Sequence, residues 1–264
     1  LYTDAALGAA PGAWERLTTG VTDMEWFAPS QVPPRFPLLS VLDLPMLGIS
    51  STRVSNHVML GLYQKFPEMR KEAYSQSHLC FLCNVGVAQI ATAKKPVRVL
   101  EDLKGQKIRV PSKVSGDAVT ALGGTAIFMP VAEIYLALEK GVIDGLHMSM
   151  IGWRGFKLYD LVKYVNAVWI SDIVVWNAMN LSKWNSLPAD IQATIEKVNE
   201  RWTKEVYPKA ADTERDWGLN KYKMKEEGKE FLAVSAEEEG RWRNAIRPIW
   251  EAWVTDITAK GNPG

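Results

Sequence analysis

Apolar and polar positions along the chain switch repeatedly between two spacings. Short apolar runs of about four to eight residues, typical of buried strands, are separated by segments whose apolar residues recur at helical spacing. The clearest helical segment has its apolar residues at Ile191, Ile195, Val198, Trp202 and Val206. Strands that alternate with helices throughout a chain predict an α/β fold with mainly parallel sheets.

Capping and turn residues divide the chain into elements. We predict one long strand over 78–92, and helices at about 9–20, 51–66, 67–75, 115–122, 131–141, 152–165, 189–227 and from 236 onward. Pro208 should kink or interrupt the longest helix, and Ser235 with Glu238 forms a capping box before the last one. No internal repeat or low-complexity linker is present, so two domains would have to be joined by several strands or helices.

The composition is that of a globular protein without a strong charge. The chain has 264 residues, of which 47% are hydrophobic, and a net charge of +1, which suits one large or two modest domains. The near-zero charge argues against nucleic acid as a partner, and no run of about 18 apolar residues is present to insert into a membrane. Eleven tryptophans are expected mainly in the core, with a few able to stack on a ligand.

The sequence lacks the motifs of common catalytic and metal centres. It contains no GxSxG elbow, HExxH motif, Walker loop or GxGxxG followed by an acidic residue. Cys80 and Cys83 form a CxxC pair, but a zinc ribbon needs a second pair. Their apolar, strand-like surroundings indicate buried thiols rather than a redox pair. We therefore expect no catalytic residue, no metal and no cofactor.

Three histidines and two acidic residues are candidates for site chemistry. His57 is expected at the surface and His78 at an edge or in the core, whereas His147 follows a strand turn and is expected near a site. Glu133 lies in the first turn of a helix, where a carboxylate offsets the helix dipole. Asp144 prepares a tight turn, so neither acid is expected to catalyse a reaction.

Arg109 is the most informative charged residue. The strand QKIRVP places it between Ile108 and Val110, where water should be scarce. Arginine offers a rigid, planar set of donors that suits a carboxylate. Two interpretations remain open from the spacing alone: Arg109 holds the carboxylate of a ligand, or it forms a structural ion pair with an acidic neighbour.

Five segments in order resemble the solute-binding proteins of TRAP (tripartite ATP-independent periplasmic) transporters of the DctP type. They are ALGAAPGAWERLTTGVTDMEWFAP, LLSVLDLPMLG, VGVAQIATAKKPVRVLEDLKGQKIRVPS, MPVAEIYLALEKGVIDG and NLSKWNSLPADIQATI. The third and fourth are the most specific, and the resemblance covers nearly the whole chain.

The resemblance implies a fold and a way of working. The fold would be the two-lobed, periplasmic-binding-protein-like (type II) fold with a long helix that spans both lobes. Lobe I would take 1–87 and 173–212, and lobe II would take 88–172 and 213–264. The family's N-terminal signal, first strand and first helix would precede Leu1. A small organic acid would bind in the cleft in the periplasm, the lobes would close by hinge bending, and the closed form would be recognised by the TRAP membrane permease.

The resemblance also implies a site, with departures from the family pattern. Arg109 matches the arginine that grips a substrate carboxylate in the family. Ala88 stands where a second arginine is common, and Met148 stands where asparagine is common, so two polar contacts are replaced by apolar ones. Val175 replaces the glutamate of relatives that bind 2-oxo acids through a metal, which argues against a metal here. The other candidate ligand contacts are Trp176, Trp153, Phe27, Met148, Asn177, Gln89 and His147.

These departures favour a monocarboxylate with an apolar or aromatic body over a dicarboxylate or a sugar acid. Three other functions remain as alternatives. The same fold serves sensor-type proteins that signal rather than deliver a solute, and the sequence does not separate the two. An enzyme would need a nucleophile or paired acid in the cleft, and none stands out. A receptor of an ATP-driven system is disfavoured by the order of the motifs.

Overall fold

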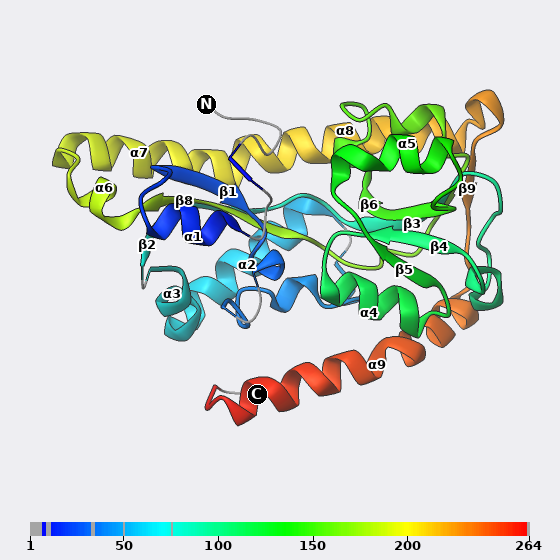
Figure 1. The fold of residues 1–264 in the computed structure, drawn as a ribbon, viewed down its shortest axis with the longest axis horizontal. Helices are drawn as coiled ribbons and strands as arrows, with labels where there is room; N and C mark the ends of the chain where they lie inside the picture. The colour runs from blue at the N-terminus through cyan, green and yellow to red at the C-terminus, as the bar shows by residue number, and fades with distance from the viewer. Residues whose placement is uncertain (1–6, 9–11, 33–34, 50, 75, 263–264) are drawn as a thin grey trace.

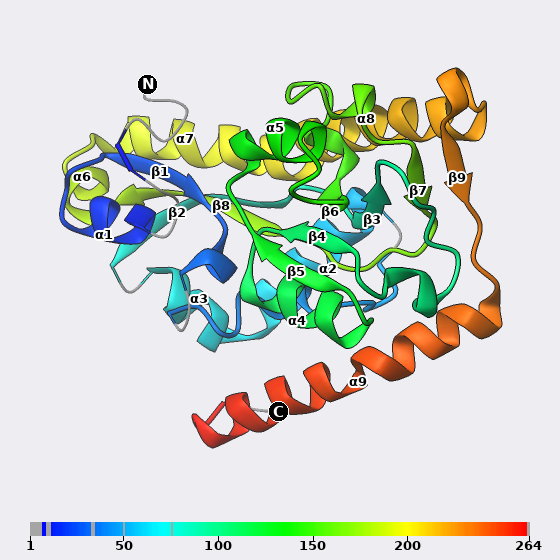
Figure 2. The same cartoon turned by 45° about the vertical axis from the view of Figure 1, so that its right-hand side comes forward.

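The computed structural model describes residues 7–8, 12–32, 35–49, 51–74 and 76–262, which form two lobes (Figures 1 and 2). Lobe I is built around a three-stranded sheet of order β1-β8-β2 and lobe II around a six-stranded sheet of order β5-β4-β6-β3-β7-β9. The strands are β1 (Met24–Phe27), β2 (Ser77–Asn84), β3 (Ala88–Thr92), β4 (Lys107–Val110), β5 (Thr125–Phe128), β6 (Gly145–Ser149), β7 (Tyr164–Asn166), β8 (Val174–Asn180) and β9 (Glu230–Leu232).

The prediction of mainly parallel sheets is wrong. Every strand pair in the lobe I sheet is antiparallel, and β3 is antiparallel to both β6 and β7. Parallel pairing is confined to β4 with β5, β4 with β6, and β7 with β9. The chain leaves lobe I along β2 and returns along β8 beside it, so these two neighbours must run in opposite directions.

The predicted long strand over 78–92 is two strands that belong to different sheets. The chain breaks at Gly86, which has a φ of 90°, a left-handed conformation that favours glycine. A Cβ atom at this position would lie 2.3 Å from the Cδ1 atom of Ile151. The break therefore requires glycine, and it carries the chain from β2 in lobe I to β3 in lobe II.

Most predicted helices are confirmed within the described residues. The α-helices outside the longest one are α1 (Ala13–Thr18), α2 (Thr52–Lys65), α3 (Pro67–Tyr74), α4 (Lys113–Ala121), α5 (Ile134–Glu139), α6 (Leu181–Asn185) and α9 (Ala236–Ala259). Short 3-10 turns are η2 (Pro29–Gln31), η3 (Val41–Asp43), η4 (Leu100–Leu103), η5 (Val131–Glu133), η6 (Met150–Gly152), η7 (Leu158–Asp160) and η9 (Glu226–Gly228). Positions 9–11 and 75 of the predicted helices lie outside the described residues.

The helix predicted over 152–165 is wrong. This segment forms the turns η6 and η7 followed by strand β7. Lys157 adopts a left-handed φ of 55°, which an α-helix does not tolerate. Trp153, Leu158 and Val162 instead pack into the core of lobe II.

The longest helix runs along one side of the molecule above both lobes (Figure 1). It consists of α7 (Ala189–Arg201), a π-helical turn (Trp202–Val206) and α8 (Tyr207–Lys223). Pro208 lacks an N–H group, and the N–H of Tyr207 donates to the carbonyl of Trp202, five residues back. The interruption predicted from Pro208 is therefore a π-helical turn.

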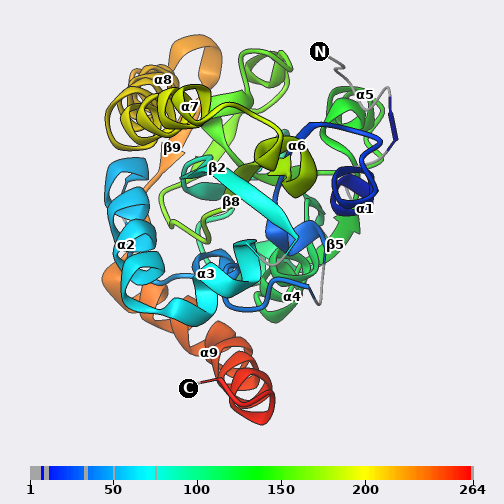
Figure 3. The same cartoon turned by 90° about the vertical axis from the view of Figure 1, so that its left-hand side faces the viewer.

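Helix α9 joins the lobes on the opposite side from α7 and α8 (Figures 1 and 3). Trp242 and Ile246 near its start pack in a lobe II core, and Ile257 near its end packs in the lobe I core. Ser235 caps it by accepting a hydrogen bond from Glu238 N at 3.1 Å. The Glu238 carboxylate binds Leu100 N and the Trp242 indole rather than closing the predicted capping box.

Two crossing segments connect the sheets, and they pair with each other. Val85 N donates to Ile173 O at 3.0 Å, and Ala88 N donates to Ser171 O at 2.7 Å. Any bending between the lobes must therefore act on these two crossings, 85–87 and 167–173, on the long helix and on α9.

No helix in the described ranges is both long enough and apolar enough to cross a membrane.

Candidate functional site

Arg109 projects from β4 on the opposite face from its neighbours. Ile108 and Val110 pack into one lobe II core, and alternation along a strand sends Arg109 to the other face. Its side chain is 5% exposed, and its Nε donates to Met129 O at 2.9 Å. Burial lowers the pKa of Arg109 to about 10, so the guanidinium is still charged at neutral pH.

Arg109 has no acidic partner in the part of the chain that the structure describes. No carboxylate of those residues lies within 4.0 Å of its guanidinium, so the structural ion pair considered from the sequence is not formed among them. A buried charge without a counter-charge is costly. An anion that reached this guanidinium would therefore be strongly stabilised.

The surrounding strands place Arg109 at the edge of lobe II that meets lobe I. Strands β4, β5 and β6 are parallel, so their carboxyl ends lie at one edge, where α/β proteins commonly bind ligands. Helix α4 follows β4 at this edge and contacts η2 of lobe I. The lobes thus touch here.

His147 lies on β6 and is fully buried. Its Nε2 is 3.2 Å from the Ser171 hydroxyl, while its Nδ1 has no hydrogen-bond partner among the described residues. Burial lowers the pKa of His147 to about 3, and the charge of Arg109 adds to the effect. His147 is therefore neutral at physiological pH and adds no second cation to the site.

Gln89 and Met148 lie on the same face of the sheet as Arg109. They face each other across the β3–β6 pair, and Leu146, two residues before Met148, is the partner of Arg109 across β4–β6. Residues two apart on a strand share a face. The Nε2 atom of Gln89 is buried without a partner among the described residues, so this amide is available to a polar ligand group.

The predicted aromatic walls lie in hydrophobic cores. Phe27 and Trp176 face each other across β1–β8 with ring centroids 5.2 Å apart, in the lobe I core. Trp153 packs against Tyr159 in a lobe II core. Asn177, next to Trp176 on β8, keeps a buried Oδ1 without a partner among the described residues. The structure does not bring these side chains to Arg109, and their contact with a ligand stays a prediction.

Sequence reasoning missed two buried carboxylates between the lobes. Asp43 ends η3, and Asp172 lies in the crossing segment before β8. Burial raises the pKa of each to about 7. The signal was present, since each acid interrupts an apolar run, LLSVLDLP for Asp43 and WISDIVVW for Asp172.

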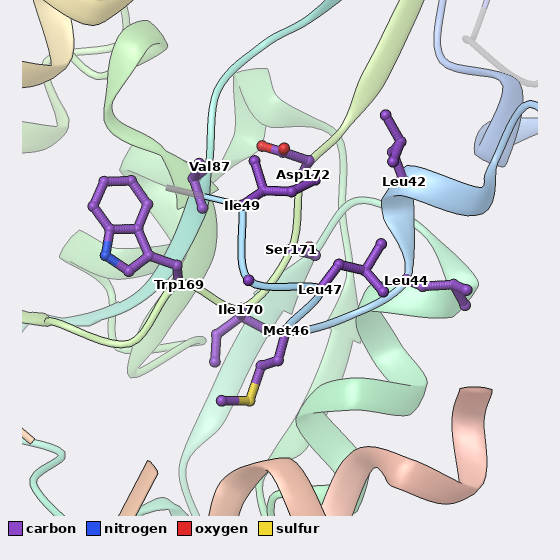
Figure 4. Close-up of a pocket in the computed structure, with 11 residues that line it drawn as sticks. Leu42, Leu44, Met46, Leu47, Ile49, Val87, Trp169, Ile170, Ser171 and Asp172 are labelled. Atoms are coloured by element: carbon purple, nitrogen blue, oxygen red, sulfur yellow. The ribbon is translucent and has the colours of Figure 1, made fainter. Parts of the chain in front are cut away.

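A small hollow of about 10 Å³ borders Asp172 (Figure 4). The loop 44–49 lines one part of it, and Val87, Ser171 and Asp172 line another. A larger apolar hollow of about 210 Å³ lies between α2, α3 and α9 and is lined by Leu62 and Trp253 among others. Arg109 borders neither hollow.

The described residues contain no group of three or more His, Cys, Asp or Glu side chains placed to hold a metal ion. Cys80 and Cys83 are buried free thiols. Burial raises their pKa values to about 11 and about 12, so neither is a reactive thiolate at neutral pH.

Comparison with known proteins connects this geometry to a family. The family described as bacterial extracellular solute-binding protein, family 7 (DctP) matches residues 1–256. The C4-dicarboxylate-binding periplasmic protein DctP of Vibrio cholerae is 30% identical over 66% of this chain and 52% of that protein. The protein of the same name from Rhodobacter capsulatus is 24% identical over 93% of this chain and 80% of that protein.

Solved structures share the fold over nearly the whole chain. A TRAP periplasmic solute-binding protein of Desulfovibrio salexigens is 26% identical, with a TM-score of 0.79 over 99% of this chain and 79% of that one. One from Bordetella bronchiseptica with bound mandelate is 23% identical, with a TM-score of 0.83 over 97% and 81%. One from Rhodoferax ferrireducens in complex with benzoate is 22% identical, with a TM-score of 0.82 over 97% and 80%.

Proposed function

Since the chain belongs to the bacterial extracellular solute-binding proteins of family 7, we propose that it is a receptor that binds a small organic carboxylate between its lobes. Closure on the ligand would present the closed form to a TRAP membrane permease in the periplasm. A sensor partner in signalling is the alternative recipient. The observation that carries the proposal is the buried guanidinium of Arg109, which no described carboxylate neutralises.

The lobes of this receptor would follow the bounds expected from the resemblance, 1–87 with 173–212 and 88–172 with 213–264. The break at Gly86 and the start of β8 support the two crossings. Met46 and Ile257 depart from this division, because Met46 packs in a lobe II core and Ile257, at the end of α9, packs in the lobe I core. The loop that carries Met46 would be part of the hinge.

The ligand would be a monocarboxylate with an apolar or aromatic body. Arg109 supplies one cation, and His147, which projects from the other face of the same sheet, is neutral, so a second carboxylate would enter the buried site without a counter-charge. Proteins of similar fold bind mandelate and benzoate, which have this chemistry. Gln89 and Asn177 would bind neutral polar groups of the ligand, while Met148, with Phe27, Trp153 and Trp176 after rearrangement, would contact its body.

Calorimetric titration of the Arg109→Ala variant tests the proposal. Benzoate, mandelate, L-malate and galacturonate form the panel. Removing one partner of a buried ion pair costs about 3–5 kcal/mol, which corresponds to a loss of about two to four decades of affinity. Arg109→Lys keeps a charge without the planar fork and should retain part of the affinity.

The matched control is Arg98→Ala, because Arg98 forms only an exposed ion pair with Glu230 and its loss should not change binding. Two results would contradict the proposal. In the first, Arg109→Ala binds the best acid as tightly as the original protein. In the second, L-malate or galacturonate binds far better than either aromatic acid, which would reject the monocarboxylate class but keep Arg109 as the anchor.

A further inference from the structure

Asp43 and Asp172 are attached to the same crossing between the lobes. Asp172 lies between Ser171 and Ile173, whose carbonyl groups accept hydrogen bonds from the other crossing segment. The Oδ1 atom of Asp43 accepts a hydrogen bond from Val174 N at 2.9 Å. Both carboxyl groups therefore sit where the chain must bend if the lobes separate.

Three of the four carboxyl oxygens have no hydrogen-bond partner among the described residues. They are Asp43 Oδ2, Asp172 Oδ1 and Asp172 Oδ2, on side chains that are 3% and 2% exposed. The hollow beside Asp172 has a volume of about 10 Å³, which is room for one water molecule at most. An ionised carboxylate in such a place is costly, and a bound proton removes the cost.

The groups packed around the pair do not neutralise it. Asp212 on α8 accepts from Thr52 N and is paired with Arg215 at 2.8 Å, and Arg215 lies 5.8 Å from the Trp169 ring. His147 reaches the crossing through Ser171 but is neutral.

The hydroxyls of Ser30 and Ser55 interact with Asp43 and Asp172, respectively, and partly oppose the rise in pKa of these carboxyl groups. Burial is the main cause of the raised pKa values, and the charge of Asp43 raises that of Asp172 further.

We propose that the carboxyl groups of Asp43 and Asp172 each hold a proton while the crossing segments are packed as they are here, and release it when the lobes separate. Hinge opening around these segments would hydrate the carboxyl groups and return them toward their ordinary pKa of 3.8, whereas closure raises the pKa to about 7. Between these two values each of the two carboxyl groups carries a proton in the closed form that it lacks in the open form. Each group then makes closure up to about tenfold less favourable for each pH unit of rise.

The proposed release of protons on opening needs no ligand, so it is tested on the ligand-free protein. Small-angle X-ray scattering from about pH 5 to pH 8.5 should show a larger radius of gyration at the higher pH, because the open form gains population. Asp172→Asn and Asp43→Asn each remove one of the two titrating carboxyl groups, so their radius should change less with pH than that of the original protein. The matched control is Asp160→Asn, which removes an exposed carboxylate in lobe II and should keep the original pH dependence.

Infrared difference spectroscopy supplies a second measurement if one variant fails to fold. The original protein at pH 6 should show the carbonyl band of a protonated carboxyl group, and this band should weaken in whichever asparagine variant folds. The proposal is overturned if the original protein shows neither the band nor a pH-dependent radius. It is also overturned if the asparagine variants keep the same pH dependence as Asp160→Asn. Binding of an acid at Arg109 can succeed or fail independently of these results.

Discussion

Arg109 and Asp172 are both buried, but burial has opposite consequences for their charge at neutral pH. Burial lowers the pKa of Arg109 only to about 10, so its cation persists throughout the physiological range. Burial raises the pKa of Asp172 to about 7, so its charge changes within that range. Arg109 is therefore suited to hold an anion at any physiological pH, whereas Asp172 is suited to respond to pH.

The raised pKa of Asp172 predicts how folding stability depends on pH. The unfolded carboxyl loses its proton near its ordinary pKa of 3.8, but the folded one keeps it up to about 7. Between these values the folded state binds more protons, so the free energy of unfolding falls as pH rises, by up to about 1.4 kcal/mol per unit. Urea unfolding of the protein and of Asp172→Asn at several pH values from 4 to 8 measures this slope.

The informative quantity is the difference in stability between the protein and Asp172→Asn, because titrating groups that do not interact with Asp172 cancel in it; Asp43 is the neighbour that does interact. This difference should favour the protein most near pH 4 and shift steadily toward the variant up to about pH 7. A difference that does not change with pH would mean that Asp172 has the same pKa in both states.

At the scale of secondary-structure elements, local signals predicted most helices, but strand pairing depended on distant residues. The helix after Ser51 and the one that begins at Pro67 follow from capping and proline rules and are present. The direction of β8 depends on its pairing with β1 and β2, which lie about 100 to 150 residues earlier. Periodicity within one segment carries no information about that pairing.

In the candidate site, too, features that depend on local sequence could be predicted, and features that depend on distant residues could not. Arg109 could be predicted because a cation in an apolar strand is a local feature, and it is buried as expected. Trp176 and Trp153 could not be assigned, since an apolar side chain suits a core and a ligand wall equally well, and both pack in cores. The proximity of Asp43 and Asp172 arises only from the fold, which brings together positions far apart in the sequence.

Two glycines predict opposite effects of the same substitution. Gly86→Ala places a Cβ atom 2.3 Å from Ile151 Cδ1 at a φ of 90°, so it should destabilise the protein by about 1–3 kcal/mol or more. Gly240→Ala, in helix α9 with nothing within 4 Å of the new atom, should stabilise it by about 1 kcal/mol. Urea unfolding checks both. Equal effects at the two positions would contradict the glycine-dependent break between β2 and β3.

At the scale of the whole molecule, the lobes are joined on two sides. The long helix of α7 and α8 runs along one side and α9 along the other (Figures 1 and 3), while the crossing segments lie between the sheets. Helix α9 contributes side chains to cores of both lobes. A destabilising substitution at either end of α9 should therefore act mainly on the lobe that this end packs against.

Ile257 tests whether α9 secures lobe I. Its side chain is fully buried in the lobe I core with Leu17 and Leu39, so Ile257→Ala should cost about 2–5 kcal/mol. The matched control is Val254→Ala, on the same helix, where the side chain is 43% exposed. A surface substitution of this kind should change the free energy of unfolding by no more than about 0.5 kcal/mol. Hydrogen exchange should show faster exchange in lobe I around Leu17 and Leu39, with little change around Trp242 in lobe II. If protection falls equally in both lobes, α9 does not hold lobe I as a separate unit, and the two lobes unfold together.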